Sequence, residues 1–162
     1  MARTARSAAV DRIMVIILGI FIVASGCMVP PAPVVLRVDP AALDDVRGIG
    51  EVQAELNNVS DLEDGGTLIS QKMIIDVGGR SGRESLDKAV DLLTARKWVI
   101  KGQNRPTIVM MATTRWNDTF LALRPYNSAY FEDNPEVLKE IKKRSINEES
   151  LVYLDISRGS IG

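Results

Sequence analysis

Apolar and polar positions along the chain change their spacing several times, and each spacing predicts an element. Over residues 39–59, apolar side chains recur every three or four positions, which is the repeat of one helical face. Gly48 and Gly50 interrupt this stretch, so two short helices fit it as well as one long helix. Residues 68–77 then read as a strand, whose run Met73-Ile74-Ile75 predicts burial on both faces.

A second helix is expected over residues 81–97. Ser81 and Glu84 have the spacing of a capping box, which marks a helix start. The side chains at helical spacing that predict its buried stripe are Leu86, Ala89, Val90 and Leu93. This helix is therefore expected to lie with one face on the sheet.

The remaining elements are expected to be three strands, a helix and a last strand. Two strands, 98–101 and 107–114, flank a five-residue hairpin loop, and a third strand covers 119–124. A helix capped by Asn134 begins at Pro135, with Val137, Leu138 and Ile141 inward, and residues 151–157 alternate as the last strand. Hairpins between helices favour an α+β fold, a single small domain with a mostly antiparallel sheet and helices on one face. We expect a ferredoxin-like arrangement with an extra strand, after an N-terminal signal helix.

The N-terminus has the layout of a secretion signal. Three arginines lie before an unbroken apolar run at residues 13–23, which has the length of a signal-peptide core. The next four residues, Ala24-Ser25-Gly26-Cys27, resemble the lipobox of bacterial lipoproteins, although Ala24 stands where a larger aliphatic residue is usual. The resemblance implies removal of residues 1–26 and lipidation of Cys27. The domain would then be lipid-anchored at the cell membrane, on its extracytoplasmic side.

An uncleaved signal anchor is the alternative, with residues 13–29 spanning the membrane. Seventeen residues at about 1.5 Å per residue reach about 25 Å, short of the roughly 30 Å hydrocarbon core. In both cases three prolines at residues 30–33 predict an extended tether over residues 27–38. The folded domain is expected over residues 39–162.

Composition removes several classes of chemistry. The chain of 162 residues has no histidine, so histidine triads and histidine-based zinc sites are excluded. Cys27 is the only cysteine, which excludes an intramolecular disulfide and any paired-cysteine metal or redox motif. We expect no cofactor, no metal and no catalytic residues. The formal net charge of −1 gives no general attraction to nucleic acid.

Two segments are candidates for binding phosphate or another anion. The glycine-rich loop at residues 78–83 lies between a strand and a helix start, with Arg80, Ser81 and Arg83 beside the free helical N–H groups. It departs from the Walker and dinucleotide-binding patterns. Residues 43–56 resemble a helix-hairpin-helix motif, which implies DNA binding through backbone amides. Acidic Glu51 and Glu55 stand where phosphate contact favours lysine.

Aromatic and basic residues around the third strand form the other candidate surface. They are Arg115, Trp116, Arg124, Tyr126, Tyr130 and Phe131. Together they would suit a groove for a peptide or glycan. We therefore expect a non-catalytic envelope lipoprotein that binds a protein, peptide or glycan, with an envelope DNA- or anion-binding module as the alternative.

Overall fold

The computed structural model describes residues 34–116, 118–144 and 147–159. They lie within one compact unit that begins at residue 33. Its strands are β1 (Val35–Arg37), β2 (Glu51–Asp61), β3 (Thr67–Asp76), β4 (Trp98–Asn104), β5 (Ile108–Thr113), β6 (Thr119–Pro125) and β7 (Leu151–Arg158). Its helices are α2 (Pro40–Arg47), α3 (Gly82–Ala95) and α4 (Pro135–Lys143), with short 3-10 turns η1 (Ser128–Phe131) and η2 (Glu148–Ser150).

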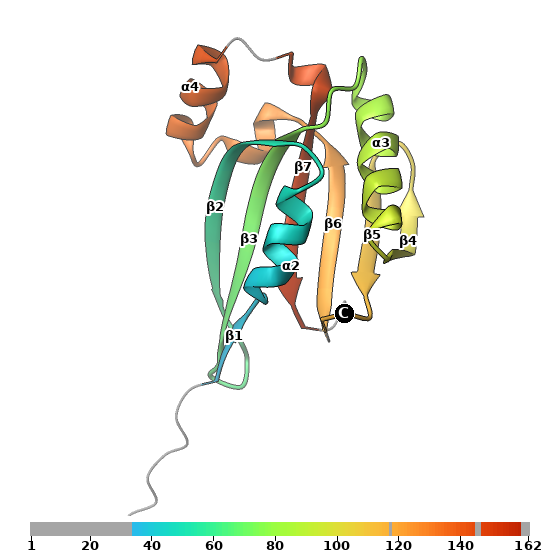
Figure 1. Cartoon of the computed structure of the whole chain (residues 1–162). Helices are drawn as coiled ribbons and strands as arrows, with labels where there is room; N and C mark the ends of the chain where they lie inside the picture. The colour runs from blue at the N-terminus through green and yellow to red at the C-terminus, as the bar shows by residue number, and fades with distance from the viewer. Residues whose placement is uncertain (1–33, 117, 145–146, 160–162) are drawn as a thin grey trace, which may run out of the picture. The chain divides into compact units, whose positions relative to one another are not determined.

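All seven strands form one sheet, and the helices pack against it (Figure 1). The order β2-β3-β7-β6-β5-β4 is antiparallel throughout, and β1 adds a short parallel pairing to β3. Because three strands lie between β3 and β4, α3 crosses over the sheet to connect them. The predicted α+β class, single domain and mostly antiparallel sheet are confirmed.

The core explains why β3 carries three consecutive apolar side chains. Met73 and Ile75 point to the side of α2 and α3, where the larger core cluster lies. Ile74 points the other way, into a smaller cluster with Ile141 of α4 and Phe131 of η1. All three side chains on β3 are fully buried, as the sequence predicts. The expectation of helices on one face holds for α2 and α3, whereas α4 packs on the opposite face.

Helix α3 follows its sequence signals closely. The hydroxyl of Ser81 accepts a hydrogen bond from the backbone N–H of Glu84, so the predicted cap is present. The buried side chains of the helix include all four predicted ones, Leu86, Ala89, Val90 and Leu93. Local capping and periodicity were sufficient here because both point to the same helix.

The predicted helix over residues 39–59 is only half right. Its first part is α2, but its second part is the long strand β2, which pairs with β3 from Glu51 to Asp61. Gly50 lets the chain approach β3 closely where β2 begins, because a Cβ there would lie 2.2 Å from the backbone oxygen of Asp76. Ala54 and Leu56 also satisfy the two-residue repeat of a strand and both pack on the smaller cluster, so pairing with β3 decides the outcome. The irregularity between Val52 and Ala54 turns Val52 to the larger cluster.

Two boundaries differ from the prediction. The expected tether over residues 27–38 overlaps the domain, because β1 pairs with β3 and Val38 is buried. The expected hairpin loop at residues 102–106 is shorter, because β4 continues to Asn104 through an irregularity between Ile100 and Gly102. With β1 and β2, the sheet has two strands more than the sequence predicts.

Residues 1–33, which include the predicted signal segment and Cys27, lie outside the described residues. Among the described helices, none has the length and apolar character needed to cross a membrane.

Candidate binding surfaces

The aromatic residues predicted to share one groove lie in two separate places. Trp116 precedes β6 and packs against the larger core cluster, whereas Tyr126 follows β6 and packs against the smaller one. The seven residues of β6 extend roughly 23 Å at 3.3 Å per residue. Since the two clusters also lie on opposite faces of the sheet, the predicted groove is wrong.

The Trp116 group lies at the rim of the larger core cluster, with Trp116 partly buried and Arg115 exposed. The guanidinium of Arg115 lies 4.5 Å from the ring centre of Trp116, whose ring is 6.3 Å from that of Trp98. The indole N–H of Trp98 donates to Asp45 at 2.9 Å, and the guanidinium groups of Arg96 and Arg115 lie 3.5 and 3.8 Å from the same carboxylate. Asp45 thereby fixes α2 to β4.

The Tyr126 and Tyr130 group covers the other face of the sheet beside α4. The ring of Tyr130 lies 5.2 Å from Tyr153, and the guanidinium of Arg124 lies 5.6 Å from the centre of the Tyr130 ring. Burial raises the pKa of Tyr153 to about 12 and also raises the pKa of Tyr126. Tyr126 and Tyr153 therefore belong to the apolar layer between the sheet and α4, whereas Tyr130 is an exposed residue of η1.

The glycine-rich loop already holds a carboxylate from the same chain. Oε2 of Glu149 accepts a hydrogen bond from the N–H of Gly82 at 2.7 Å, at the N-terminus of α3. The carbonyl of Glu149 also accepts from the hydroxyl of the fully buried Ser85 at 2.6 Å. Ser81 caps the helix, while the side chains of Arg80 and Arg83 are exposed. Glu149 thus occupies the position where a bound anion would lie.

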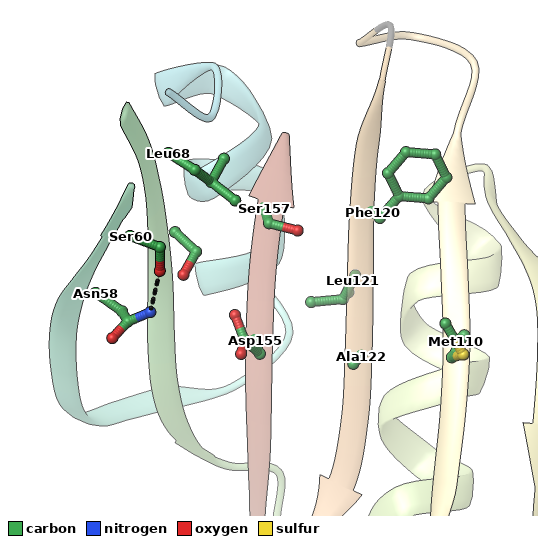
Figure 2. A pocket seen from close by; sticks show the side chains of 10 residues that line it. Asn58, Ser60, Leu68, Met110, Phe120, Leu121, Ala122, Asp155 and Ser157 are labelled. Carbon is green, nitrogen blue, oxygen red and sulfur yellow. Dashed lines mark hydrogen bonds between the residues drawn. The ribbon is translucent and has the colours of Figure 1, made fainter. Parts of the chain in front are cut away.

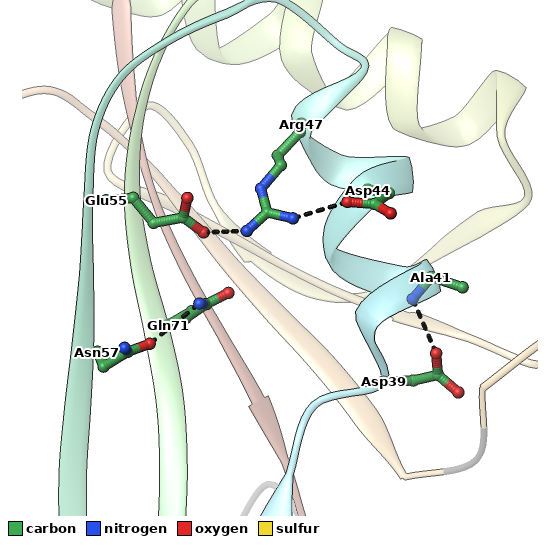
Figure 3. Close-up of polar contacts among 7 residues, drawn as sticks. All are labelled: Asp39, Ala41, Asp44, Arg47, Glu55, Asn57 and Gln71. Atoms are coloured by element: carbon green, nitrogen blue, oxygen red, sulfur yellow. Dashed lines mark hydrogen bonds and ion pairs between the residues drawn. The ribbon is translucent and has the colours of Figure 1, made fainter.

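The helix-hairpin-helix resemblance at residues 43–56 is not matched by the structure. Its second helix is absent, because residues 51–56 belong to β2. The basic residue of this segment, Arg47, donates to Asp44 at 2.7 Å and to Glu55 at 2.6 Å (Figure 3). The hydrogen bond to Glu55 is the main cause of the raised pKa of Arg47. Its charge is therefore engaged by carboxylates and not presented to a phosphate.

A different surface, the open-face hollow, lies on the same face of the sheet as α4, over the part of that face that α4 does not cover (Figure 2). Its volume is about 340 Å³. Five strands contribute its lining, which consists of Asn58, Ser60, Leu68, Ser70, Met110, Phe120, Leu121, Ala122, Asp155 and Ser157. Apolar side chains thus lie beside hydroxyl, amide and carboxylate groups, a mixture that suits a ligand with alternating apolar and polar groups.

Asp155 is the charged group of the open-face hollow. Burial raises the pKa of its carboxyl group, while the cations Lys72 and Arg124 act in the opposite direction. Lys72 is its cross-strand partner on β3. The carboxylate therefore lies in a partly dry position where a hydrogen-bond donor from a ligand gains more than it does in water.

A second hollow, the helix-side hollow, lies between α2 and the sheet and has a volume of about 390 Å³. Its lining residues are Arg37, Val38, Pro40, Leu43, Asn57, Val59, Ile69 and Gln71. The amide nitrogen of Gln71 donates to Asn57 at 3.0 Å (Figure 3), and the buried amide oxygen of Gln71 has no partner within the described part of the chain. Residues of β2 thus border a hollow on each face of the sheet.

Neither hollow was predicted from the sequence. Polar residues at alternate positions of β2 and β7 line the open-face hollow, together with Ser70 of β3, and the alternation in β7 is visible in the sequence. The sequence does not show the pairing that brings these three strands together.

The acidic turn after β2 contains Asp61, Glu63 and Asp64 and is held by its own hydrogen bonds. The carboxylate of Asp64 accepts from the N–H of Gly66, and the carbonyl of Gly66 accepts from the N–H of Leu62. Within residues 34–116, 118–144 and 147–159, no group of three acidic, cysteine or histidine side chains is placed to hold a metal ion.

Comparisons with protein-family models, with curated proteins and with solved structures found no match to this chain.

Proposed function

We propose that this chain is a lipoprotein of the cell envelope, anchored to the membrane through Cys27, whose domain is a non-catalytic binding module on the extracytoplasmic side. The lipobox-like residues 24–27 after an apolar run support the anchor. The open-face hollow is the observation that supports binding, because it combines apolar side chains with the partly buried carboxylate of Asp155. An envelope protein, peptide or glycan is the class of ligand expected there.

The absence of histidine from the whole sequence favours binding over acid–base catalysis near neutral pH. The two segments that would serve a DNA- or anion-binding module are engaged otherwise. Glu149 lies at the N-terminus of α3, and residues 51–56 form a strand. That alternative therefore has no supporting contact in the described residues.

Metabolic labelling with a fatty acid tests the anchor. Wild type is expected to carry the label and to have an intact mass that lacks residues 1–26, whereas Cys27→Ala carries none. Label that persists in Cys27→Ala, or a wild-type mass that retains residues 1–26, would contradict the lipoprotein assignment.

Photochemical cross-linking tests the binding surface. A benzophenone amino acid in place of Phe120, on the open-face hollow, is expected to give a discrete cross-linked product in intact cells. The matched control carries it in place of Asp91, an exposed residue of α3. Equal products from both positions, or none from the Phe120 position, would refute binding at the hollow.

A further inference from the structure

Among the described residues, three strands have an unpaired side: the three-residue β1 and the longer strands β2 and β4. The two longer strands are not equally protected against pairing with another chain. An exposed edge offers unpaired N–H and C=O groups, which proteins usually protect by shortness, bulges, lysine or proline. Strand β4 has seven residues, a bulge between Ile100 and Gly102, and Lys101 exposed at that irregularity. It therefore carries two such protections, the bulge and the lysine.

Strand β2 lacks these protections over its second half. It has eleven residues and contains neither lysine nor proline, and its irregularity lies near its start, between Val52 and Ala54. Residues 57–61, here called the free edge, form a regular ladder with β3, and no strand pairs with their outer side within the described part of the chain. Val59 is 63% exposed in the middle of it.

The free edge lies between the two hollows. Asn58 and Ser60 line the open-face hollow, whereas Asn57 and Val59 line the helix-side hollow. A strand added beside β2 would direct its side chains alternately to the two faces of the sheet. Its backbone would pair with β2, and each set of side chains would lie beside one hollow, which is how added strands gain affinity and specificity.

The charge near the free edge selects the partner. Asp61 ends β2, and Glu63 and Asp64 follow in the turn, all three exposed and without an ion pair among the described residues. Glu55 is already neutralised by Arg47. Antiparallel pairing of the free edges of two copies would place their acidic turns at opposite ends of the shared ladder, so a second copy offers these carboxylates no opposite charge. A segment with basic residues is attracted instead.

We propose that the free edge of β2 binds an extended, positively charged peptide segment of another protein by β-strand addition. This inference rests on the proposed binding function and names its partner chemistry. The membrane-anchored protein would thus bind the backbone of the peptide by strand pairing. It would select the side chains of the peptide through the two hollows and the acidic turn.

Nuclear magnetic resonance of the full-length, ¹⁵N-labelled chain in detergent micelles tests this. The probe is a short acetylated and amidated peptide that alternates threonine and valine between terminal lysines. Its addition is expected to shift the amide signals of residues 57–61 most. A peptide with terminal glutamates is expected to bind at least about tenfold more weakly, because like charges then face each other.

Two exposed valines on opposite edges give a matched pair of variants. Val59→Lys is expected to weaken binding of the lysine peptide at least about tenfold through charge repulsion. Val99→Lys, on β4, is expected to change it by less than about twofold. Circular dichroism checks that both variants fold.

Several results would overturn the assignment: no binding of the lysine peptide, equal binding of both peptides, the largest shifts on β4, or equal effects of the two variants. Concentration-dependent shifts of residues 57–61 without peptide would identify a second copy as the occupant and also overturn it. Any of these leaves the lipoprotein proposal intact, since that is tested through Cys27 and the Phe120 position.

Discussion

The carboxylate of Asp45 is expected to be one of the most important polar groups for stability. Its side chain is only 13% exposed, and its Oδ2 accepts the indole N–H of Trp98, which is 1% exposed. The substitution Asp45→Ala removes this acceptor and leaves the N–H buried without a partner. Such a loss costs about 1–3 kcal/mol. The guanidinium groups of Arg96 and Arg115 are more than one third exposed, so their attraction adds at most about 1 kcal/mol.

We therefore expect Asp45→Ala to lower the free energy of unfolding by about 2–3 kcal/mol. For a domain of this size, that corresponds to a melting temperature lower by roughly 6–10 °C. Thermal melts followed by far-ultraviolet circular dichroism measure this without using tryptophan fluorescence, which the substitution itself would alter.

Asp44→Ala is the matched control, one residue away on the same helix. Its carboxylate is 73% exposed and pairs with Arg47 at the surface. The expected loss is below about 0.5 kcal/mol. A double-mutant cycle of Asp45→Ala with Trp98→Phe should give a coupling of about 1–2 kcal/mol, because only the pair shares the hydrogen bond. Equal melting temperatures for Asp44→Ala and Asp45→Ala, or no coupling, would refute the role assigned to Asp45.

Three further predictions concern packing and pH. Gly79→Ala is expected to lower the free energy of unfolding, measured by urea denaturation, by about 2–3 kcal/mol, because the new Cβ would lie 2.0 Å from Oγ of Ser85. The control Gly102→Ala has open space around it and should change this free energy by less than about 0.5 kcal/mol. Since burial raises the pKa of Tyr153 to about 12, the native state keeps the phenolic proton up to a higher pH than the unfolded chain does. Stability should therefore fall as pH rises from about 10 to about 12, and Tyr153→Phe should remove that part of the fall when unfolding midpoints are compared. The pKa of Asp155 is also raised by burial, so stability should fall as pH rises above about 4 through its native pKa; an unchanged pH dependence in Asp155→Asn would contradict this.

The elements that the sequence predicts correctly are those whose signals are local. Helix α3 has both a cap at Ser81 and a buried stripe at helical spacing, and the two agree. Strand β3 is apolar on consecutive residues, because helices cover both faces of the sheet at that position. No knowledge of the rest of the chain was needed for either.

Strand β2 and the hollows depend on contacts between distant parts of the chain. Leu56 fits a helical repeat with Val52 and a strand repeat with Ala54 equally well, so only the ladder with β3 decides between them. The open-face hollow combines residues as far apart as Asn58 and Ser157, each of which is unremarkable in its own strand. Because the missed strand is also the edge strand, an error of secondary structure hid the surface that we propose to be functional.

The path of the chain into the domain relates the anchor to the free edge. The carbonyl of Val34 accepts a hydrogen bond from the N–H of Thr67, and residues 67–69 of β3 pair with β1 on one side and with Val59 to Asp61 on the other. The domain therefore begins at the end of the sheet where the free edge lies. If Cys27 carries the lipid, the seven residue steps from Cys27 to Val34 span at most about 25 Å. Under the proposed anchoring, this length limits how far that end can move from the bilayer surface, so a segment that adds to β2 must itself come near the membrane. A basic segment adjoining the membrane anchor of another protein meets this condition, whereas the mid-region of a large distant partner does not.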